Sequence, residues 1–347
     1  MRFFQRSRAK TGQSHSGPRI QPLRPTMHFL QVLVHCSWHL IETARYEQSL
    51  EILQVCLDAW NDFDARDAYP TIYTHICNHM GVANHWSGNF DQSAKFYGEV
   101  YKIHHDIFPD GHFERGNILC NLGNLHLSLG KPEAALKYHL EAQTSFKIGQ
   151  PAEAEFTDQA IISTGRAKCY LDLGRLQEAR ETANYSIDAL TKLGYTLSRA
   201  HSIRLLGDIE FAEGHLPAAK KCYEQSKNLL LKEMGTRTHQ MLGAAYIRLG
   251  CLAQETGDYT KAICWFRDAL KLADFNTFCK GYRARSLYML SQALQAVPDP
   301  SPTIRSEAEA TVHEAKTLLR QILGDKFREE MCNDGATFDN LVVVHVR

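Results

Sequence analysis

Long apolar runs and strand-like patterns are missing from this sequence. No stretch approaches the roughly 18 consecutive apolar residues of a transmembrane helix, so we expect no membrane partner. No segment sustains the alternation of apolar and polar residues that a half-buried strand would show. Apolar residues nevertheless make up 44% of the 347 residues, which is enough for a sizeable buried interior. The sequence therefore predicts an all-α protein.

The motifs of several common enzyme classes are also missing. The chain contains no phosphate-binding G-x-x-x-x-G-K-[ST] loop, no G-x-S-x-G nucleophile elbow, no H-E-x-x-H zinc motif and no dinucleotide fingerprint. We therefore predict a protein that is not an enzyme and that needs no cofactor.

None of the ten cysteines belongs to a Cys-x-x-Cys pair. Most of them fall inside expected helices, where a thiol packs as a small apolar side chain. This distribution favours a reducing compartment over a disulfide framework, and we expect a cytoplasmic protein.

No acidic residue occurs before Glu42. The chain as a whole is balanced, with 39 lysine and arginine residues and 39 aspartate and glutamate residues. Residues 1–27 contain six basic residues, as an acid-poor mitochondrial presequence would. Glycines and prolines interrupt any amphipathic helix there after about residue 11. We favour a disordered tail over residues 1–27, or a start codon placed upstream of Met27, with mitochondrial targeting as the alternative.

A pattern of small residues stands out in "NLGNLHLSLGKPEAALKYHLEA", which begins at residue 121. Gly123 lies inside an expected helix, where glycine costs about 1 kcal/mol relative to alanine. Gly130 is placed to make a turn, and Pro132 can begin a second helix because its missing amide hydrogen costs nothing there. We infer that Gly123 allows the two helices to approach closely, with Ala135 facing it.

The same pattern returns along the chain, which indicates a solenoid of repeated units. We predict that the third unit is a pair of helices at 116–129 and 132–147. A small residue ends each first helix: Ala44, Gly88, Gly130, Gly174, Gly214 and Gly257. Another small residue follows five positions later: Ser49, Ser93, Ala135, Ala179, Ala219 and Ala262. The expected units lie at 30–63, 74–107, 116–149, 160–193, 200–233 and 243–276, with a degenerate pair at 282–323 and a C-terminal cap at 324–347.

This pattern resembles the tetratricopeptide repeat, which implies a right-handed superhelical solenoid of about six to seven helix pairs. The turn glycines lie about 40 to 44 residues apart, against about 34 in the family's minimal unit. The longer period is similar to that of kinesin light chains and of the carboxy-terminal arrays of fungal signalling ATPases. The order of Pro109, Asp110 and His112, and the ending "FDNLVVVHVR", also look like the fungal proteins. The "LVVVHV" stretch could be a strand or an apolar cap.

The resemblance implies that the first helix of each pair lines a concave groove. Amide and imidazole side chains there could hydrogen-bond a peptide backbone, and Trp86 or Phe211 could provide an apolar anchor. An ordinary solvated polar face is the alternative interpretation. The family's groove positions, carried over to this sequence, are His75, Asn78, His85, Trp86, Asn117, Cys120, Asn124, Thr164, Lys168, Asp172, His201, Arg204, Asp208 and Phe211.

Histidine is abundant, with 17 residues, and two of them suggest a metal site. His75 and His79 lie one helical turn apart, a spacing that can hold zinc or copper. Further ligands would have to come from elsewhere, because Cys77 points off that face. We therefore expect a groove-facing or packed pair and no metal. His139 replaces the usual aromatic residue of a second helix and is expected to be a packed imidazole.

Two functions remain open at this point. The first is an interaction scaffold that binds a peptide or helix of a protein partner. The second is a fungal pathway accessory or regulatory protein, for example from a biosynthetic gene cluster or as a remnant of a signalling ATPase, that binds a small effector. The lysines, asparagines and arginine that clamp chaperone carboxyl termini in this family are not assembled here. The aligned positions hold Asn78 and Val82, then Cys120 and Asn124, then Thr164 and Lys168. The body also lacks a basic stripe, so we expect no nucleic acid partner.

Overall fold

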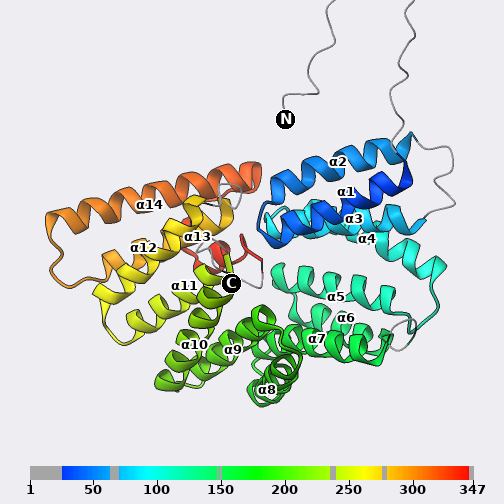
Figure 1. Cartoon of the computed structure of the whole chain (residues 1–347). Coiled ribbons are helices and arrows are strands. Elements are labelled where there is room, and N and C mark those ends of the chain that lie inside the picture. Colours follow the sequence, from blue (N-terminus) through cyan, green and yellow to red (C-terminus); the bar gives the residue numbers. More distant parts are fainter. Residues whose placement is uncertain are drawn as a thin grey trace, which may run out of the picture.

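The protein is a curved array of helices (Figure 1). The computed structural model describes residues 26–62, 70–146, 148, 151–234, 240–275 and 280–343. Most of the expected basic tail, and the last four residues of the expected cap, lie outside the described residues. The first four pairs are α1 (Met27–Glu42) with α2 (Tyr46–Asn61), α3 (Pro70–Trp86) with α4 (Phe90–Ile107), α5 (Phe113–Ser128) with α6 (Pro132–Ser145), and α7 (Ala152–Asp172) with α8 (Leu176–Leu193).

Three more pairs and a short terminal segment complete the array, and the all-α prediction is confirmed. The pairs are α9 (Thr196–Ala212) with α10 (Leu216–Met234), α11 (Gln240–Glu255) with α12 (Tyr259–Phe275), and α13 (Lys280–Gln295) with α14 (Pro302–Leu323). The segment after them contains η2 (Gly324–Lys326), η3 (Glu329–Asn333) and α15 (Gly335–Asp339).

Each of the six turn residues expected from the sequence has a positive φ. At Gly130 φ is 69°, a conformation that glycine adopts without the steric penalty of a β-carbon. The amide of Lys131 then donates to the carbonyl of His126 at 2.9 Å, which satisfies a carbonyl at the end of α5. Ala44 makes the same turn with φ at 57°. The prediction that these residues end the first helices is confirmed.

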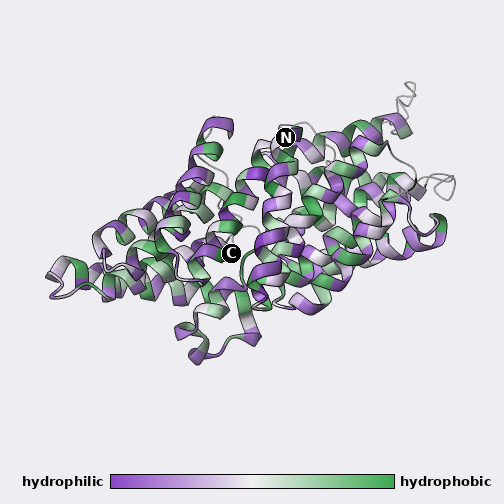
Figure 2. Ribbon diagram, turned by 90° about the horizontal axis from the view of Figure 1, so that it is seen from below, coloured by the Kyte–Doolittle hydropathy of each residue, from purple (hydrophilic) through white to green (hydrophobic). Residues whose placement is uncertain are grey.

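The first helices form the inner layer of the array. Each contacts the first helix of the next pair, from α1 against α3 through to α11 against α13. From α2 to α12, each second helix packs between the first helix of its own pair and that of the following pair, whereas α14 packs on α13 and on the terminal segment. Hydrophobic and hydrophilic residues are interspersed along the helices, as expected where every helix packs on several neighbours (Figure 2). This arrangement curves the array around the inner layer (Figure 1).

A buried imidazole fills the contact that Gly123 makes. A β-carbon at Gly123 would lie 2.8 Å from Cε1 of His139, and one at Gly165 would lie 2.6 Å from the same atom. The expectation that Ala135 faces Gly123 is therefore wrong, because the longer His139 side chain reaches back from one turn further on. Ala135 packs one turn further along α5, in a cluster with Leu127 and with Cys169 of α7. His139 is completely buried, so its prediction as a packed imidazole is confirmed.

The pair expected at 116–129 and 132–147 corresponds to α5 and α6. Helix α5 begins earlier than expected because the ring of His112 accepts a hydrogen bond from the amide of Glu114 at 3.3 Å and so caps the helix. None of the helices in the described ranges combines the length and apolar character needed to cross a membrane.

The chain returns to the inside of the curve after α14 (Figure 1). Leu341, Val342 and Val343 are buried and do not form a strand, so this part of the "LVVVHV" stretch is an apolar cap. The remainder of that stretch lies outside the described residues.

Candidate functional site: a groove along the first helices

The inner layer carries a groove that runs along several pairs. Its larger part has a volume of about 1060 Å³ and is lined mainly by α1, α3, α5 and α7. A smaller part, of about 180 Å³, continues toward α9 and α11. Cys120, Asn124 and Ile161 line both parts, so the two parts adjoin each other. We call this surface the inner groove.

Asparagine side chains follow one another along the inner groove. Asn117, Asn121 and Asn124 lie at i, i+4 and i+7 of α5 and therefore share one helix face. Asn121 donates to the amide oxygen of Asn78 on α3 at 2.9 Å, which joins two neighbouring pairs. Each amide offers both a donor and an acceptor, the combination that an extended peptide backbone also presents. The groove therefore presents amide groups along α3 and α5.

Aromatic side chains provide the apolar surface of the groove. Trp38, on α1, is 39% exposed, and its ring centre lies 5.0 Å from that of His79. Trp86 lines the smaller part of the groove and stacks on Tyr46 at a ring-centre distance of 6.2 Å. These side chains present apolar faces that are held in place by neighbouring rings.

The charged residues among the described lining of the groove are acidic. Glu114 and Asp158 line its larger part, while neither lysine nor arginine occurs among the described residues that line either part. His75 lies 3.9 Å from the carboxylate of Glu114. Burial alone would raise the pKa of Glu114, but His75, followed by His104 and His112, lowers it below its ordinary value. The Glu114 carboxylate is therefore held in its charged form.

The positions carried over from the family separate into two sets. One set lines the inner groove: His75, Asn78, Trp86, Asn117, Cys120, Asn124, Thr164 and His201. The second set packs within the array: His85, Lys168, Arg204, Asp208 and Phe211. Their assignment as groove residues is corrected, because neighbouring first and second helices pack against these side chains. Asp172 forms an ion pair with Lys168.

Two of these packed residues belong to a buried ion-pair network. The carboxylate of Asp208 lies 2.9 Å from the guanidinium of Arg204 and 2.8 Å from that of Arg248. Tyr223 also donates its hydroxyl to Asp208 at 3.0 Å. These residues link α9, α10 and α11, so their role is to hold neighbouring pairs together.

The groove contains residues that the sequence analysis missed. Asn121 could have been found from the helical spacing of Asn117, Asn121 and Asn124. Trp38 and the histidines of α1 were missed because the first unit is degenerate and no groove positions were transferred to it. Ile161, Leu197 and Met241 were missed because apolar side chains carry no signal that separates groove from core.

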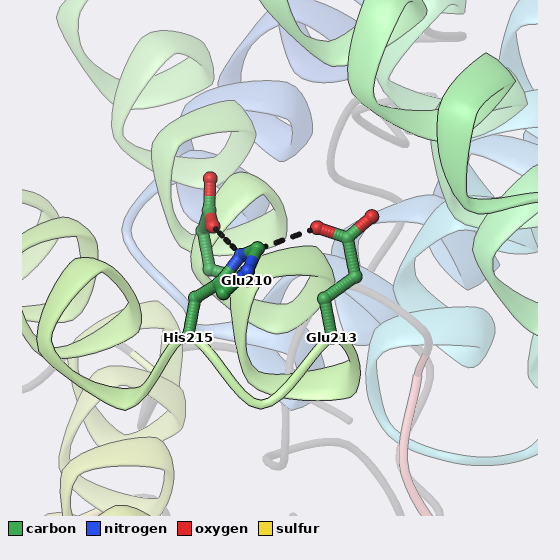
Figure 3. A group of neighbouring side chains, drawn as sticks. All are labelled: Glu210, Glu213 and His215. Atoms are coloured by element: carbon green, nitrogen blue, oxygen red, sulfur yellow. Dashed lines mark hydrogen bonds and ion pairs between the residues drawn. The ribbon is translucent and has the colours of Figure 1, made fainter.

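A possible metal-binding group lies outside the groove. Glu210, Glu213 and His215 place one potential ligand atom each within 4.8 Å of one another, and Figure 3 shows the imidazole between the two carboxylates. Arg180 of α8, however, already forms ion pairs with both carboxylates. We therefore interpret this group as an ion-pair network between the fourth and fifth pairs, and we assign it no metal.

The imidazole of His79, one of the two histidines with metal-like spacing, is held by Ser37 on α1. Its Nδ1 atom lies 3.1 Å from the hydroxyl of Ser37. Burial, followed by the charge of His75 and a smaller effect of His35, lowers the pKa of His79 from 6.5 to about 4. This imidazole is therefore neutral near pH 7.

Acidification is expected to destabilise the first two pairs through His79. Its folded pKa lies below its unfolded pKa, so the unfolded state binds more protons between about pH 6.5 and pH 4. The contribution of neutral His79 is complete above this window and is lost as the pH falls through it. Thermal melts across the window should show a smaller loss in His79→Gln than in the wild type. The matched control is His313→Gln, an exposed position on α14 that should melt like the wild type at each pH. An unchanged pH dependence in His79→Gln would contradict the assignment.

The fold and the groove define a helical repeat solenoid with a concave inner layer. A family model described as "Tetratricopeptide repeat" matches residues 71–147, and a second with the same description matches residues 243–276. The chain therefore carries tetratricopeptide repeats. A search of curated proteins finds no match to the sequence.

Solved structures share the fold at low sequence identity. The Rap conjugation gene regulator of plasmid pLS20 in complex with the Phr* peptide is 13% identical, with 90% of this chain and 93% of that chain covered and a TM-score of 0.57. A Rap protein complexed with competence and sporulation factor is 12% identical, with 90% and 95% covered and a TM-score of 0.54. Repeats of a putative kinesin light chain from Podosopora anserina are 18% identical, with 61% and 99% covered and a TM-score of 0.44. The similarity to fungal signalling ATPases stays a prediction.

Proposed function

We propose that this chain is a non-enzymatic interaction scaffold that binds a peptide segment of a protein partner in its inner groove. The row of amides on α3 and α5 carries the proposal. Asn78 and Asn121 bridge two pairs, so a peptide that crosses the pairs meets donors and acceptors in succession. Trp86, backed by Tyr46, provides an apolar contact further along the same path.

The charge of the groove narrows the class of peptide. Its described lining contains Glu114 and Asp158 but neither lysine nor arginine. A free carboxylate or an acidic side chain would be repelled there, whereas a basic side chain would be attracted. The preferred ligand is therefore an internal peptide segment that is neutral or basic.

The size of the groove favours a peptide over a small effector. Small-molecule pockets usually have volumes of about 300–1,000 Å³ and enclose most of their ligand. The larger part of the groove, at about 1060 Å³, lies at the upper limit of this range, and its lining extends over the first helices of four pairs, which suits an extended peptide. Two solved structures of the same fold are described as complexes with the Phr* peptide and with competence and sporulation factor, which supports a peptide as the ligand.

Peptides selected from a phage-displayed random library should depend on the groove amides and on Trp86. We expect Trp86→Ala to weaken binding by about 2 kcal/mol, because truncation of a central aromatic contact commonly has an effect of this size. Asn78→Ala and Asn124→Ala should each weaken binding by about 1 kcal/mol through lost hydrogen bonds. Isothermal titration calorimetry of one selected peptide measures all three effects.

Matched controls come from the second helices. Lys137→Ala on α6 and Glu224→Ala on α10 alter charged residues outside the groove and should leave the affinity unchanged. Circular dichroism confirms that each variant is folded at the temperature of the titration. Loss of binding in the two controls, with retention in the three groove variants, would place the ligand elsewhere and refute the proposal.

A further inference from the structure

The last described residues of the chain lie between the N-terminal part of the array and its last pair. A β-carbon at Gly88, just after α3, would lie 3.1 Å from the carbonyl oxygen of Leu341. A β-carbon at Gly281, near the start of α13, would collide with the same oxygen. A β-carbon at Gly130, just after α5, would lie 3.7 Å from the side-chain oxygen of Asn340, an ordinary van der Waals contact. One short segment therefore contacts the second, third and seventh pairs, and Figure 1 places it inside the curve.

The contact is apolar on both sides of the segment. Val342 and Val343 are 3% and 1% exposed. They belong to one apolar cluster with Tyr97 from the N-terminal half of the array and with Phe266 and Tyr282 from the C-terminal half. This segment thus completes a core that residues far apart in the sequence share.

An ion pair between a buried arginine and a partly exposed aspartate holds the segment in register. Asp339 lies 2.6 Å from Nε of Arg285, whose side chain is 1% exposed. A guanidinium at such a depth is stable only with good partners, so the carboxylate is a specific feature of the contact. Asp334 accepts hydrogen bonds from the amides of Ala336 and Thr337 at 3.1 and 3.0 Å and so caps α15, which delivers Asp339 to this place.

We propose that residues 339–343 act as an intramolecular peptide ligand, and that the surface they occupy is a second peptide-docking site. This docking surface consists of the ends of α3 and α5 and the start of α13. This surface binds an aspartate that is followed by aliphatic residues two to four positions later. When it is occupied, the segment bridges the N-terminal and C-terminal parts of the curved array. A partner segment with the same chemistry would have to displace residues 339–343, and the array would then remain bridged by the partner.

The test weakens the internal contact by substitution in the full chain and then adds the native segment as a separate peptide. The variant combines Asp339→Ala with Val342→Glu, and the probe is a fluorescent peptide with the sequence of residues 334–343. We expect the variant to bind the probe, measured by fluorescence anisotropy. The wild type should bind it roughly 10²–10⁴-fold more weakly, because its tethered segment competes at high effective concentration. A probe that carries the Asp339→Ala change should bind neither protein.

Small-angle X-ray scattering provides an independent measurement. The variant should have a larger radius of gyration than the wild type, and addition of the probe should reverse the increase. If circular dichroism shows that the double variant has lost helix, Asp339→Asn replaces it, because this substitution preserves the shape of the side chain. The control for Asp339→Asn is Asp325→Asn, at an exposed position in η2. Equal affinity of wild type and folded variant for the probe, or no binding by the folded variant, would overturn the proposal.

Discussion

Asp208→Ala is expected to lower the free energy of unfolding by about 3–5 kcal/mol, the usual effect of removing one partner from a buried ion pair. Asp208 is 7% exposed and contacts the guanidinium groups of both Arg204 and Arg248. Alanine would leave these two cations at the interface of α9 and α11 without their shared carboxylate. Urea denaturation followed by circular dichroism measures the change.

An exposed aspartate provides the matched control for this prediction. Asp268 on α12 forms an ion pair with Lys271 at 2.9 Å, and both side chains are well exposed. Asp268→Ala should change the free energy of unfolding by about 0–1 kcal/mol, because water screens the pair. Repeat arrays can unfold in parts, so the midpoint of the transition is compared together with its free energy. Equal effects of the two substitutions would mean that Asp208 does not hold the fifth and sixth pairs together.

Gly123→Leu is expected to cost about 1–3 kcal/mol of stability through overpacking. The β-carbon alone would lie 2.8 Å from the ring of His139, which is completely buried and therefore has little room to move. Gly207→Leu should behave in the same way against Tyr223, whose ring would lie 2.7 Å from a β-carbon at that position. Thermal melts measure both effects.

A second substitution separates this steric effect from helix propensity. His139→Ala makes space beside Gly123, so the cost of Gly123→Leu should be smaller in that background than in the wild type. Gly98→Ala is the matched control, because a β-carbon at Gly98 on α4 meets nothing within 4 Å. It should stabilise the protein by about 0.5–1 kcal/mol, since alanine is the better helix former. A cost of Gly123→Leu that is the same with and without His139 would show that the helix contact is misassigned.

The fold could be predicted because its signals are local. Gly130 makes its turn by its own φ, and Pro132 stands at the start of the next helix, where its missing amide hydrogen costs nothing. Repetition of this unit along the sequence is enough to imply the solenoid. The sequence did not predict which side chain packs against Gly123, because Ala135 was expected there. The identity of the group that fills a gap depends on the reach of each side chain, and His139 reaches further.

The groove could be predicted only in part. Asn78 and Asn124 line it as expected, but Arg204 and Asp208, chosen by the same rule, are buried. Each first helix has one face toward the groove and another toward the next first helix, and both faces carry polar residues in this chain. Polarity therefore does not distinguish a ligand-binding face from an ion-paired interface.

The sequence by itself determined the helix pairs, their turns and the order in which they stack, because these follow from small residues at short spacings. The tertiary structure decided which polar side chains remain in the inner groove and which neutralise each other between pairs. It also decided the position of residues 339–343 beside Gly88 and Gly281. That contact joins positions some two hundred and fifty residues apart in the chain, and its existence depends on the accumulated curvature of the whole array.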